Sequence, residues 1–174
     1  MSPAGTTHGT DELYERLRAH QGRPAAVAGR GRDPVNTPMI RHWCEALRHP
    51  APPDGSAPAT MLQVWTMPGL DGMGGARSPA YEALLAALDD AGYTAVVATD
   101  CEQEYAQPLR PGDAVAFDGV IESVSPRKTT RLGTGYFVTT RTDIRTATGA
   151  LAGTHRFRIL KYRPERRGQA PPQA

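Results

Sequence analysis

The second half of the chain alternates between apolar and polar residues, and this pattern predicts β-strands. Four segments, at 94–105, 114–125, 132–146 and 152–162, are rich in β-branched and aromatic residues and are separated by turn sequences such as PLRPGD. Their short connections leave no room for the crossover helices of a parallel sheet. The pattern therefore predicts an antiparallel, meander-like sheet, with a bulge near Gly119.

The first half has the periodicity of amphipathic helices, in addition to a short helix near its amino terminus. One helix is predicted to follow Thr37, a good N-cap residue, with Pro38 in its first position. Another is predicted to start at Ser78 and Pro79 and to stop at Gly92. The apolar positions of these two helices are Ile40, Trp43, Cys44 and Leu47, and Leu84, Leu85 and Leu88.

A curved antiparallel sheet needs another element over its concave face. The helix after Thr37 has the more pronounced apolar stripe, so we expect it to cover that face. A sheet wrapped around one central helix is the hot-dog fold, an α+β architecture. We expect this domain to span residues 10–163, between a disordered segment at 1–9 and a flexible tail or linker at 164–174.

Composition excludes several classes of protein. A chain of 174 residues with a net charge of +2 fits one domain and has no strong field for nucleic acid. Its basic residues are not interleaved with a stacking aromatic platform. It has neither an apolar run of the roughly 18 residues that a membrane span needs nor an apolar signal core. Cys44 and Cys101 form no CxxC pair, so we expect reduced thiols, no metal and a cytoplasmic location.

Four segments together resemble a known family. They are RDPVNTPMIRHWCEAL, ATMLQVWTMPG, DDAGYTAVVATDCEQEYAQPLRPGD and SVSPRKTTRLGTGYF, and they lie within residues 10–163. They are similar to the amino-terminal MaoC-like domain of the large subunit of the bacterial steroid side-chain enoyl-CoA hydratase. The run from CEQEY to GYF is the specific part, because PLRPGD alone is common among hot-dog proteins.

The resemblance implies a heteromeric hydratase that acts on a bulky, steroid-type acyl-CoA. In that family a small MaoC subunit carries the catalytic Asp and His, and the MaoC-like part of the large subunit packs beside it around one acyl-CoA. The resemblance implies no cofactor beyond the coenzyme A of the substrate. Relative to the family, the segment after the first long helix is shortened to RHPAPPDGSAPATM, which includes residues 49–59 and puts the shape of the pocket in question.

Hydration of an enoyl thioester needs a base for water, an acid for the α-carbon and donors for the enolate oxygen. The Asp and His of MaoC hydratases lie in a GDxNPxH-like motif, which this chain lacks. Asp54 and His49 are isolated, and Asp33 with His42 is a weak candidate pair beside the alternative that Asp33 shapes a turn. His155 is more typical of a hydrogen-bonded core histidine than of a catalyst. We therefore predict no catalytic residue in this chain.

A basic hairpin is the best candidate for binding coenzyme A, whose phosphates favour Arg and Lys at a solvent-facing rim. The residues predicted for this rim are Arg127, Lys128, Thr129, Arg131, Gly133 and Gly135. The two glycines permit close approach of either a ligand or a neighbouring strand. A solvated hairpin is the alternative. Trp65 and Met67 are predicted to form an apolar wall for the acyl group, although a core or interface role fits them equally well.

The leading hypothesis is a hydratase subunit that supplies the pocket wall and the rim, while a partner supplies the catalytic pair. Two alternatives remain. One is a non-catalytic scaffold or assembly module that is indifferent to acyl-CoA. The other is a hot-dog thioesterase, for which Glu45 is the only acidic residue well inside the helix that we expect to be central.

Overall fold

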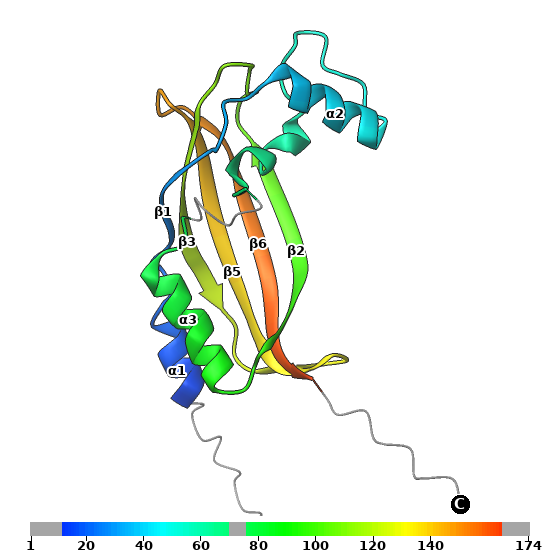
Figure 1. The fold of residues 1–174 in the computed structure, drawn as a ribbon. Coiled ribbons are helices and arrows are strands. Elements are labelled where there is room, and N and C mark those ends of the chain that lie inside the picture. The colour runs from blue at the N-terminus through cyan, green and yellow to red at the C-terminus, as the bar shows by residue number, and fades with distance from the viewer. Residues whose placement is uncertain (1–11, 70–75, 165–174) are drawn as a thin grey trace, which may run out of the picture.

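Six strands form one curved antiparallel sheet in the computed structural model, which describes residues 12–69 and 76–164. Along this sheet the strand order is β1-β3-β5-β6-β2, and the short β4 pairs with β5 beyond the end of β3 (Figure 1). The strands are β1 (Pro24–Arg30), β2 (Ala95–Tyr105), β3 (Val115–Val124), β4 (Lys128–Thr130), β5 (Gly133–Thr146) and β6 (Leu151–Pro164).

The four predicted strands are confirmed as β2, β3, β5 and β6, and they form an antiparallel sheet. The meander holds only for β3, β5 and β6. β2 pairs with β6 and not with β3, because the segment after β2 carries the chain across one end of the sheet to the far side of β5 (Figure 1). β2 is therefore an edge strand.

β1 was not predicted, because its sequence PAAVAGR is short and dominated by small residues. Its pairing with β3 is irregular on either side of Ala26, which lies opposite Gly119. The irregularity expected near Gly119 is therefore carried by β1, and β3 has another between Ile121 and Ser123 in its pairing with β5. The outer side of β1 is partly covered, because Ala26 forms a bridge with Arg77.

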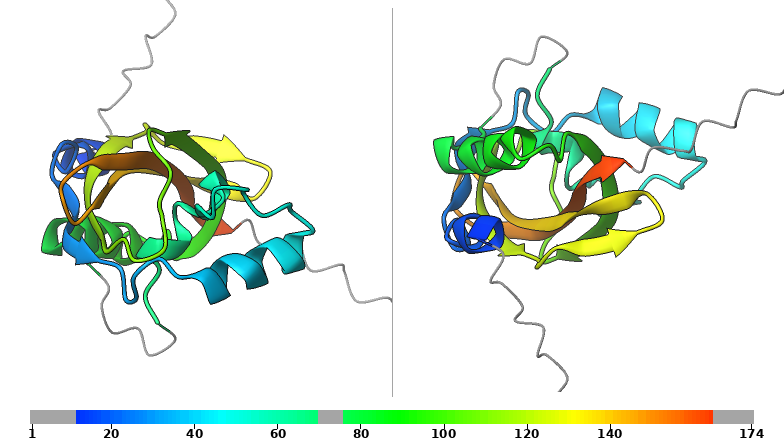
Figure 2. Two further views of the ribbon diagram at one scale, coloured as in Figure 1. Left: turned by 90° about the horizontal axis from the view of Figure 1, so that it is seen from above. Right: turned by 90° about the horizontal axis from the view of Figure 1, so that it is seen from below.

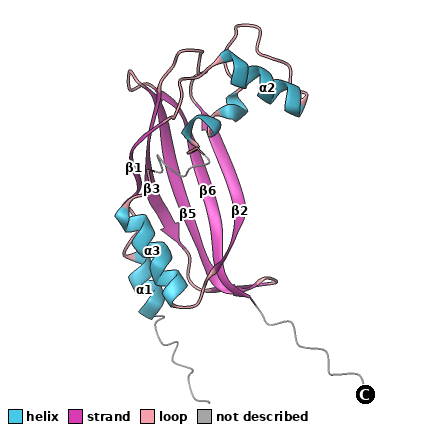
Figure 3. Ribbon diagram, viewed as in Figure 1, coloured by secondary structure: helices cyan, strands magenta, loops and turns pink. Residues whose placement is uncertain are grey.

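Three α-helices and two short 3-10 helices accompany the sheet (Figure 3). They are α1 (Glu12–Arg18), α2 (Thr37–Leu47), η1 (Ala59–Met61), η2 (Val64–Thr66) and α3 (Pro79–Asp90). The start of α3 is as predicted, with Ser78 as N-cap accepting a bond from the Tyr81 amide, and Gly92 follows its end in a left-handed conformation. The N-cap of α2 is Asn36 and not Thr37, because the Asn36 side chain accepts from the Met39 amide at 3.0 Å.

The helix on the concave face is α3, and the prediction that the helix after Thr37 occupies this place is wrong. Leu84 and Leu88 of α3 are fully buried against residues of β3 and β5, including Ile121 and Tyr136. α2 lies beyond one end of the sheet and projects outside the curl of the strands, and its Leu47 is 58% exposed (Figures 1 and 2). The hot-dog arrangement is therefore present, with a different central helix from the one expected.

The concave face carries two separate apolar clusters. One joins α1 and α3 to the half of the sheet near the start of β5. The other joins α2, η1 and η2 to the opposite end, where Trp65 and Met61 pack against Val115 and Ile144. The core is therefore split along the strands, because α3 covers only one half of the face.

The carboxyl end of α3 is fixed to the sheet by an ion pair between a buried lysine and a half-exposed aspartate. Lys161 of β6 is 6% exposed, and its Nζ lies 2.5 Å from a carboxylate oxygen of Asp89. At the amino end, the Ser78 hydroxyl also donates to the Pro24 carbonyl oxygen of β1. These contacts hold both ends of α3 against the strands.

Pro164 belongs to β6, so the ordered domain extends one residue past the predicted boundary. The disordered segment predicted at 1–9 and the rest of the predicted tail lie outside the described residues. Among the helices within residues 12–69 and 76–164, none is both long enough and apolar enough to cross a membrane.

Candidate functional site

The predicted basic hairpin is present. β4 pairs with the start of β5, with Thr129 opposite Thr134, and the Arg127, Lys128 and Arg131 side chains are exposed around it. Arg127 and Thr129 border a hollow of about 550 Å³ between this hairpin and the end of β6. The other residues that line the hollow are Tyr93, Thr134, Arg163 and Pro164. The arrangement places two guanidinium groups, two threonine side chains and one tyrosine around one solvent-facing space.

Arg163 was missed by the sequence analysis, which assigned it to no site. The register of β5 and β6 places Arg163 opposite Thr134, so the hairpin and the end of β6 are neighbours in space. Its Nη2 donates to the Ala91 carbonyl oxygen at 2.6 Å, and its guanidinium lies 5.1 Å from the centre of the Tyr93 ring. Arg163 is therefore held in place by the turn that follows α3.

Gly135 is explained by strand packing. A Cβ atom at this position would lie 2.2 Å from the Lys161 carbonyl oxygen and 2.8 Å from the Tyr162 Cα of β6. Gly133, at the start of β5, has a φ of 133°, which favours glycine. The sequence allowed close approach of either a ligand or a neighbouring strand, and at Gly135 it is the neighbouring strand β6 that comes close.

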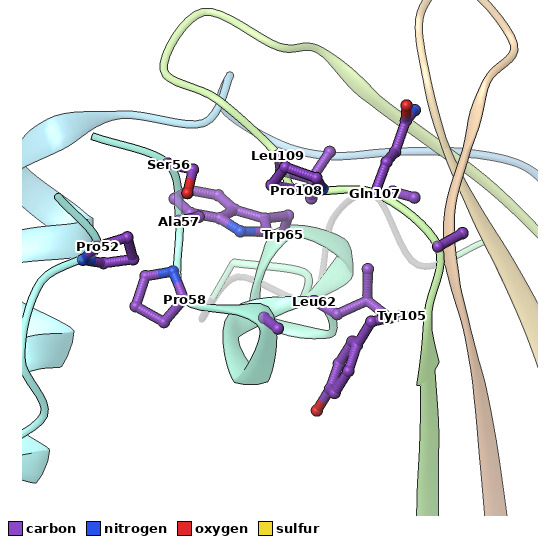
Figure 4. A pocket seen from close by; sticks show the side chains of 13 residues that line it. Pro52, Ser56, Ala57, Pro58, Leu62, Trp65, Tyr105, Gln107, Pro108 and Leu109 are labelled. Carbon is purple, nitrogen blue, oxygen red and sulfur yellow. The ribbon is translucent and has the colours of Figure 1, made fainter. Parts of the chain in front are cut away.

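Trp65 lines an apolar pocket of about 320 Å³ at the end of β2. The indole is 3% exposed and belongs to the apolar cluster at this end of the sheet. Its ring lies close to Ala57 and Leu109, and the rest of the wall comes from Pro58, Leu62, Tyr105 and their neighbours (Figure 4). Trp65 therefore lines a pocket and also belongs to the core, and its role as a wall for an acyl group stays a prediction.

The shortened segment after α2 forms much of this wall. Pro52, Ser56, Ala57, Pro58 and Ala59 all line the pocket. Its turn is fixed by Asp54, whose carboxylate accepts from the Ser56 hydroxyl at 2.7 Å and pairs with Arg110 at 3.0 Å. The hydrogen bonds from Ser56 are the main cause that lowers the pKa of Asp54. Asp54 is therefore accounted for by the structure of this loop.

Met67 does not line the same pocket as the rest of the wall. Its side chain is 58% exposed and borders a smaller hollow of about 270 Å³ that Trp65 shares with Arg32 and Asp33. The structure therefore brings Met67 beside Trp65 without placing it in the larger pocket.

The predicted wall and the predicted rim lie at opposite ends of the sheet. The Trp65 carbonyl lies beside Gly31, close to Val115, and Val115 pairs with Thr146 at the end of β5. The hairpin is at the other end, where Thr130 pairs with Gly133 at the start of β5. The 14 residues of β5 span roughly 45 Å along the strand. The two groups therefore do not form one compact site within this chain.

The weak catalytic candidates on and before α2 face solvent. Asp33 and His42 are both exposed, and the adjacent Asn36 is the N-cap of the helix. Glu45 lies within reach of Arg41 at 4.0 Å, with a 66% exposed side chain. Because α2 is not the central helix, the premise that placed Glu45 over a thioester is wrong.

His155 is buried on the concave face, 5% exposed, as expected for a core histidine. Its Nε2 lies 3.2 Å from the Cys101 Sγ of β2, and its ring stacks on Phe157 with 5.8 Å between ring centres. Burial lowers the pKa of His155 below its ordinary value of 6.5. The side chain is therefore a neutral imidazole at physiological pH.

Neither cysteine is in a disulfide: Cys44 is buried in α2, and Cys101 is exposed. Across residues 12–69 and 76–164, no group of three or more His, Cys, Asp and Glu side chains could hold a metal ion. The absence of a metal or cofactor stays a prediction.

Comparison with known proteins agrees with the fold and with the resemblance noted in the sequence. Over 174 residues the chain is 40% identical to a probable enoyl-CoA hydratase alpha subunit of Thermomonospora curvata, a match that covers 91% of this chain and 54% of the relative. It is 38% identical over 169 residues to the 3-oxo-4,17-pregnadiene-20-carboxyl-CoA hydratase alpha subunit of Mycobacterium tuberculosis, covering 90% and 54%. The chain thus spans about half the length of both relatives.

A solved structure gives the same result. A chain of the ChsH1–ChsH2 complex from Mycobacterium tuberculosis superposes with a TM-score of 0.74 and 34% identity, covering 92% of this chain and 93% of that one. The family model described as FAS1-like, dehydratase domain region, matches residues 24–154, which is most of the chain. The chain therefore belongs to the FAS1-like dehydratase family, the MaoC-like group that the sequence resembles.

Proposed function

We propose that this chain is a subunit of an enoyl-CoA hydratase that acts on a bulky acyl-CoA of the steroid type. In this proposal the chain supplies the wall of the acyl pocket and a rim for coenzyme A, and a small MaoC-type partner supplies the catalytic Asp and His. Relatives named as hydratase alpha subunits support the reaction class. The full sequence lacks the GDxNPxH motif, which supports the division of labour.

The observation that carries the proposal is the position of the apolar pocket relative to the open edge of the sheet. The pocket includes Tyr105, the last residue of β2, and the Ala106 and Gln107 that follow it. β2 has β6 as its one neighbour in the strand order, so its other edge is unpaired. An acyl group in this pocket would therefore lie beside whatever protein pairs with that edge.

A long unpaired edge favours pairing with another strand. β2 has 11 residues, most of them exposed. Its acidic side chains do not oppose the pairing of another strand, because they are neutralised by β6: Asp100 pairs with Arg158 at 3.0 Å and Glu104 pairs with Arg156 at 2.8 Å. These ion pairs hold β2 against β6, although the pairing of the two strands is irregular between Ala98 and Asp100, and they leave the backbone groups of the outer edge available. This supports a partner subunit docked along β2.

The hollow beside the β4–β5 hairpin is our candidate for the coenzyme A rim. Guanidinium groups bind phosphate through charge-assisted, often bidentate, hydrogen bonds. Arg127 and Thr129, both predicted from the sequence, border this hollow, and Arg163 adds a second guanidinium. Lys128 and Arg131 are exposed on the same hairpin and would strengthen the local positive field.

Calorimetry of coenzyme A binding to the complex with its co-purifying MaoC-type partner tests this proposal. Each lost charge-assisted contact is worth about 1.5–3 kcal/mol, so Arg163→Ala is expected to weaken binding about tenfold or more. The matched control is Arg18→Ala, which removes an exposed arginine that pairs with Glu15 on α1. Equal affinity for both variants would exclude the hollow as the rim.

Titration of the same complex with an acyl-CoA, followed by an assay for free thiol, separates the alternatives. A scaffold module would give a complex that binds no acyl-CoA. A thioesterase would release free coenzyme A thiol, and Glu45→Gln would abolish that release. The exposed position of Glu45 outside the concave face gives the thioesterase no structural support.

A further inference from the structure

Cys101 and His155 form a thiol–imidazole pair that the proposed hydration does not use. The Cys101 Sγ lies 3.2 Å from the His155 Nε2, a distance typical of a nucleophile and its base. Cys101 is exposed on the edge strand β2, whereas His155 is 5% exposed on β6. The nucleophile of the pair is therefore the exposed residue, and its base is the buried one.

The imidazole is held in position among uncharged neighbours. Its ring stacks on Phe157 at an interplanar angle of 28°. The residues paired with His155 on the flanking strands are Gln103 and Thr142, neither of which titrates. The charged residues 102, 104 and 156 occupy the positions between Cys101, Gln103 and His155, so their side chains point to the opposite face of the sheet. There Arg156 forms ion pairs with Glu102 and Glu104. Within the strands described, Cys101 is the titratable group that faces this imidazole.

We propose that Cys101 and His155 are a nucleophilic pair that adds to α,β-unsaturated thioesters, a ligand class that rests on the proposed function. The Cys101 sulfur attacks the β-carbon while the His155 Nε2 takes the thiol proton, and the π electrons move to the thioester as an enolate. The imidazolium then returns the proton to the α-carbon. A C–S bond and a C–H bond form, the C=C π bond and the S–H bond break, and no oxidant or reductant is needed.

The position of the pair fits this ligand. Cys101, Gln103 and Tyr105 occupy alternate positions of β2 and share its concave face, and Tyr105 lines the apolar pocket. Cys101 is four residues from Tyr105, roughly 13 Å along the strand. An acyl-CoA that enters along β2 would therefore pass the thiol. The product would be a thioether at the β-carbon, with the thioester bond intact.

The first test is the pH dependence of alkylation by N-ethylmaleimide, an α,β-unsaturated carbonyl reagent that needs no coenzyme A site. Cys44→Ser leaves Cys101 as the one thiol in the chain. An unassisted thiol with a pKa near about 8.5 reacts about tenfold more slowly for each pH unit below it. With His155 as base, the rate is expected to stay within about twofold between pH 7.5 and about 6.5, because burial lowers the pKa of the imidazole below 6.5.

Variants of the pair and of its neighbour sharpen this test. In the Cys44→Ser background, His155→Gln is expected to slow alkylation at least about fivefold at pH ~6.5 and to restore the steep pH profile. Thr142→Val, at the register partner of His155 on β5, is the matched control and should keep the rate. A tenfold fall per pH unit in the Cys44→Ser chain overturns the proposal without relying on a substitution at the buried histidine.

The second test uses crotonyl-CoA, with butyryl-CoA as the saturated control, and intact mass as the readout. Crotonyl-CoA is expected to add the mass of the whole thioester to Cys44→Ser but not to Cys44→Ser/Cys101→Ser, and butyryl-CoA to neither. A chain that follows the expected maleimide profile yet never adds crotonyl-CoA would exclude thioesters as the ligand. Neither readout involves hydration, so this proposal and the proposed function can fail separately.

Discussion

Gly135 ties the predicted rim to the packing of the sheet. Replacing it with Ala would place a Cβ 2.2 Å from the Lys161 carbonyl oxygen, so β5 and β6 would have to separate. We expect Gly135→Ala to lower the free energy of unfolding by about 1–3 kcal/mol in urea titrations without any ligand. Gly119→Ala, whose closest contact would be 3.2 Å, is the control and should cost less. Equal stability of Gly135→Ala and the wild type would contradict the packing role of this glycine and favour contact with a ligand instead.

His155 should make the stability of the fold depend on pH. Burial lowers the pKa of His155 below 6.5, so the unfolded chain takes up a proton that the folded chain resists. Stability is therefore highest above pH ~6.5 and falls as the pH drops below it towards the folded-state pKa. The pKa of Asp54 lies below 3.8, so protonation of Asp54 lowers the stability only at much lower pH. Urea unfolding at pH ~7.5 and ~5.5 should show a larger loss for the wild type than for His155→Gln. The same loss in both would contradict this assignment.

At the residue scale, the sequence identified what its local context determines. The basic hairpin was predicted because Arg127, Lys128 and Arg131 are close in sequence. Arg163 was missed because the register of β5 and β6 brings it to the hairpin, and register depends on long-range pairing. Thr134 and Arg163 could have been matched from the alternating pattern once β5 and β6 were taken as a hairpin.

Among the elements, α3 and α2 differ in their contribution to the core. Leu88 of α3 is fully buried, whereas Leu47 of α2 is 58% exposed. We expect Leu88→Ala to lower the free energy of unfolding by about 2–5 kcal/mol. Leu47→Ala, the same substitution on the helix that the sequence favoured, should change it by less than about 0.5 kcal/mol. Chemical denaturation of both variants measures the difference, and a reversed order would restore α2 as the central helix.

The error over the central helix has a physical cause. The apolar stripe of α2 is real, since Ile40 and Cys44 are buried, but it packs against the segment around η1 and η2 beyond the end of the sheet. Amphipathicity indicates that a helix covers something and not what it covers. Chain order was the better signal, because α3 precedes β2 with only a short turn at Gly92 and so folds back under the sheet.

The strands were predicted more closely than the topology. Each of the four predicted segments lies within about two residues of its strand, because alternation over ten or more residues is a strong local pattern. The placement of β2 beside β6 is a property of the whole sheet. The irregular β1 left no alternation to detect.

At the scale of the whole molecule, the predicted rim and the apolar pocket are separated by the length of the sheet and do not form one closed cleft within the described residues. α3 covers one half of the concave face, and the pocket lies at the other end beside the unpaired edge of β2. In the proposed assembly, a subunit that docks along β2 would form the wall of the acyl-CoA site on that side of the sheet. The family membership and the relatives named as alpha subunits agree with such an assembly.

Steady-state hydration of a bulky enoyl-CoA tests the central claim most directly. The assay follows the loss of the conjugated thioester with the purified chain, with the purified MaoC-type partner and with their complex. The account predicts turnover near background for the chain alone and efficient hydration by the complex. Turnover by the chain alone at a rate equal to that of the complex would contradict it.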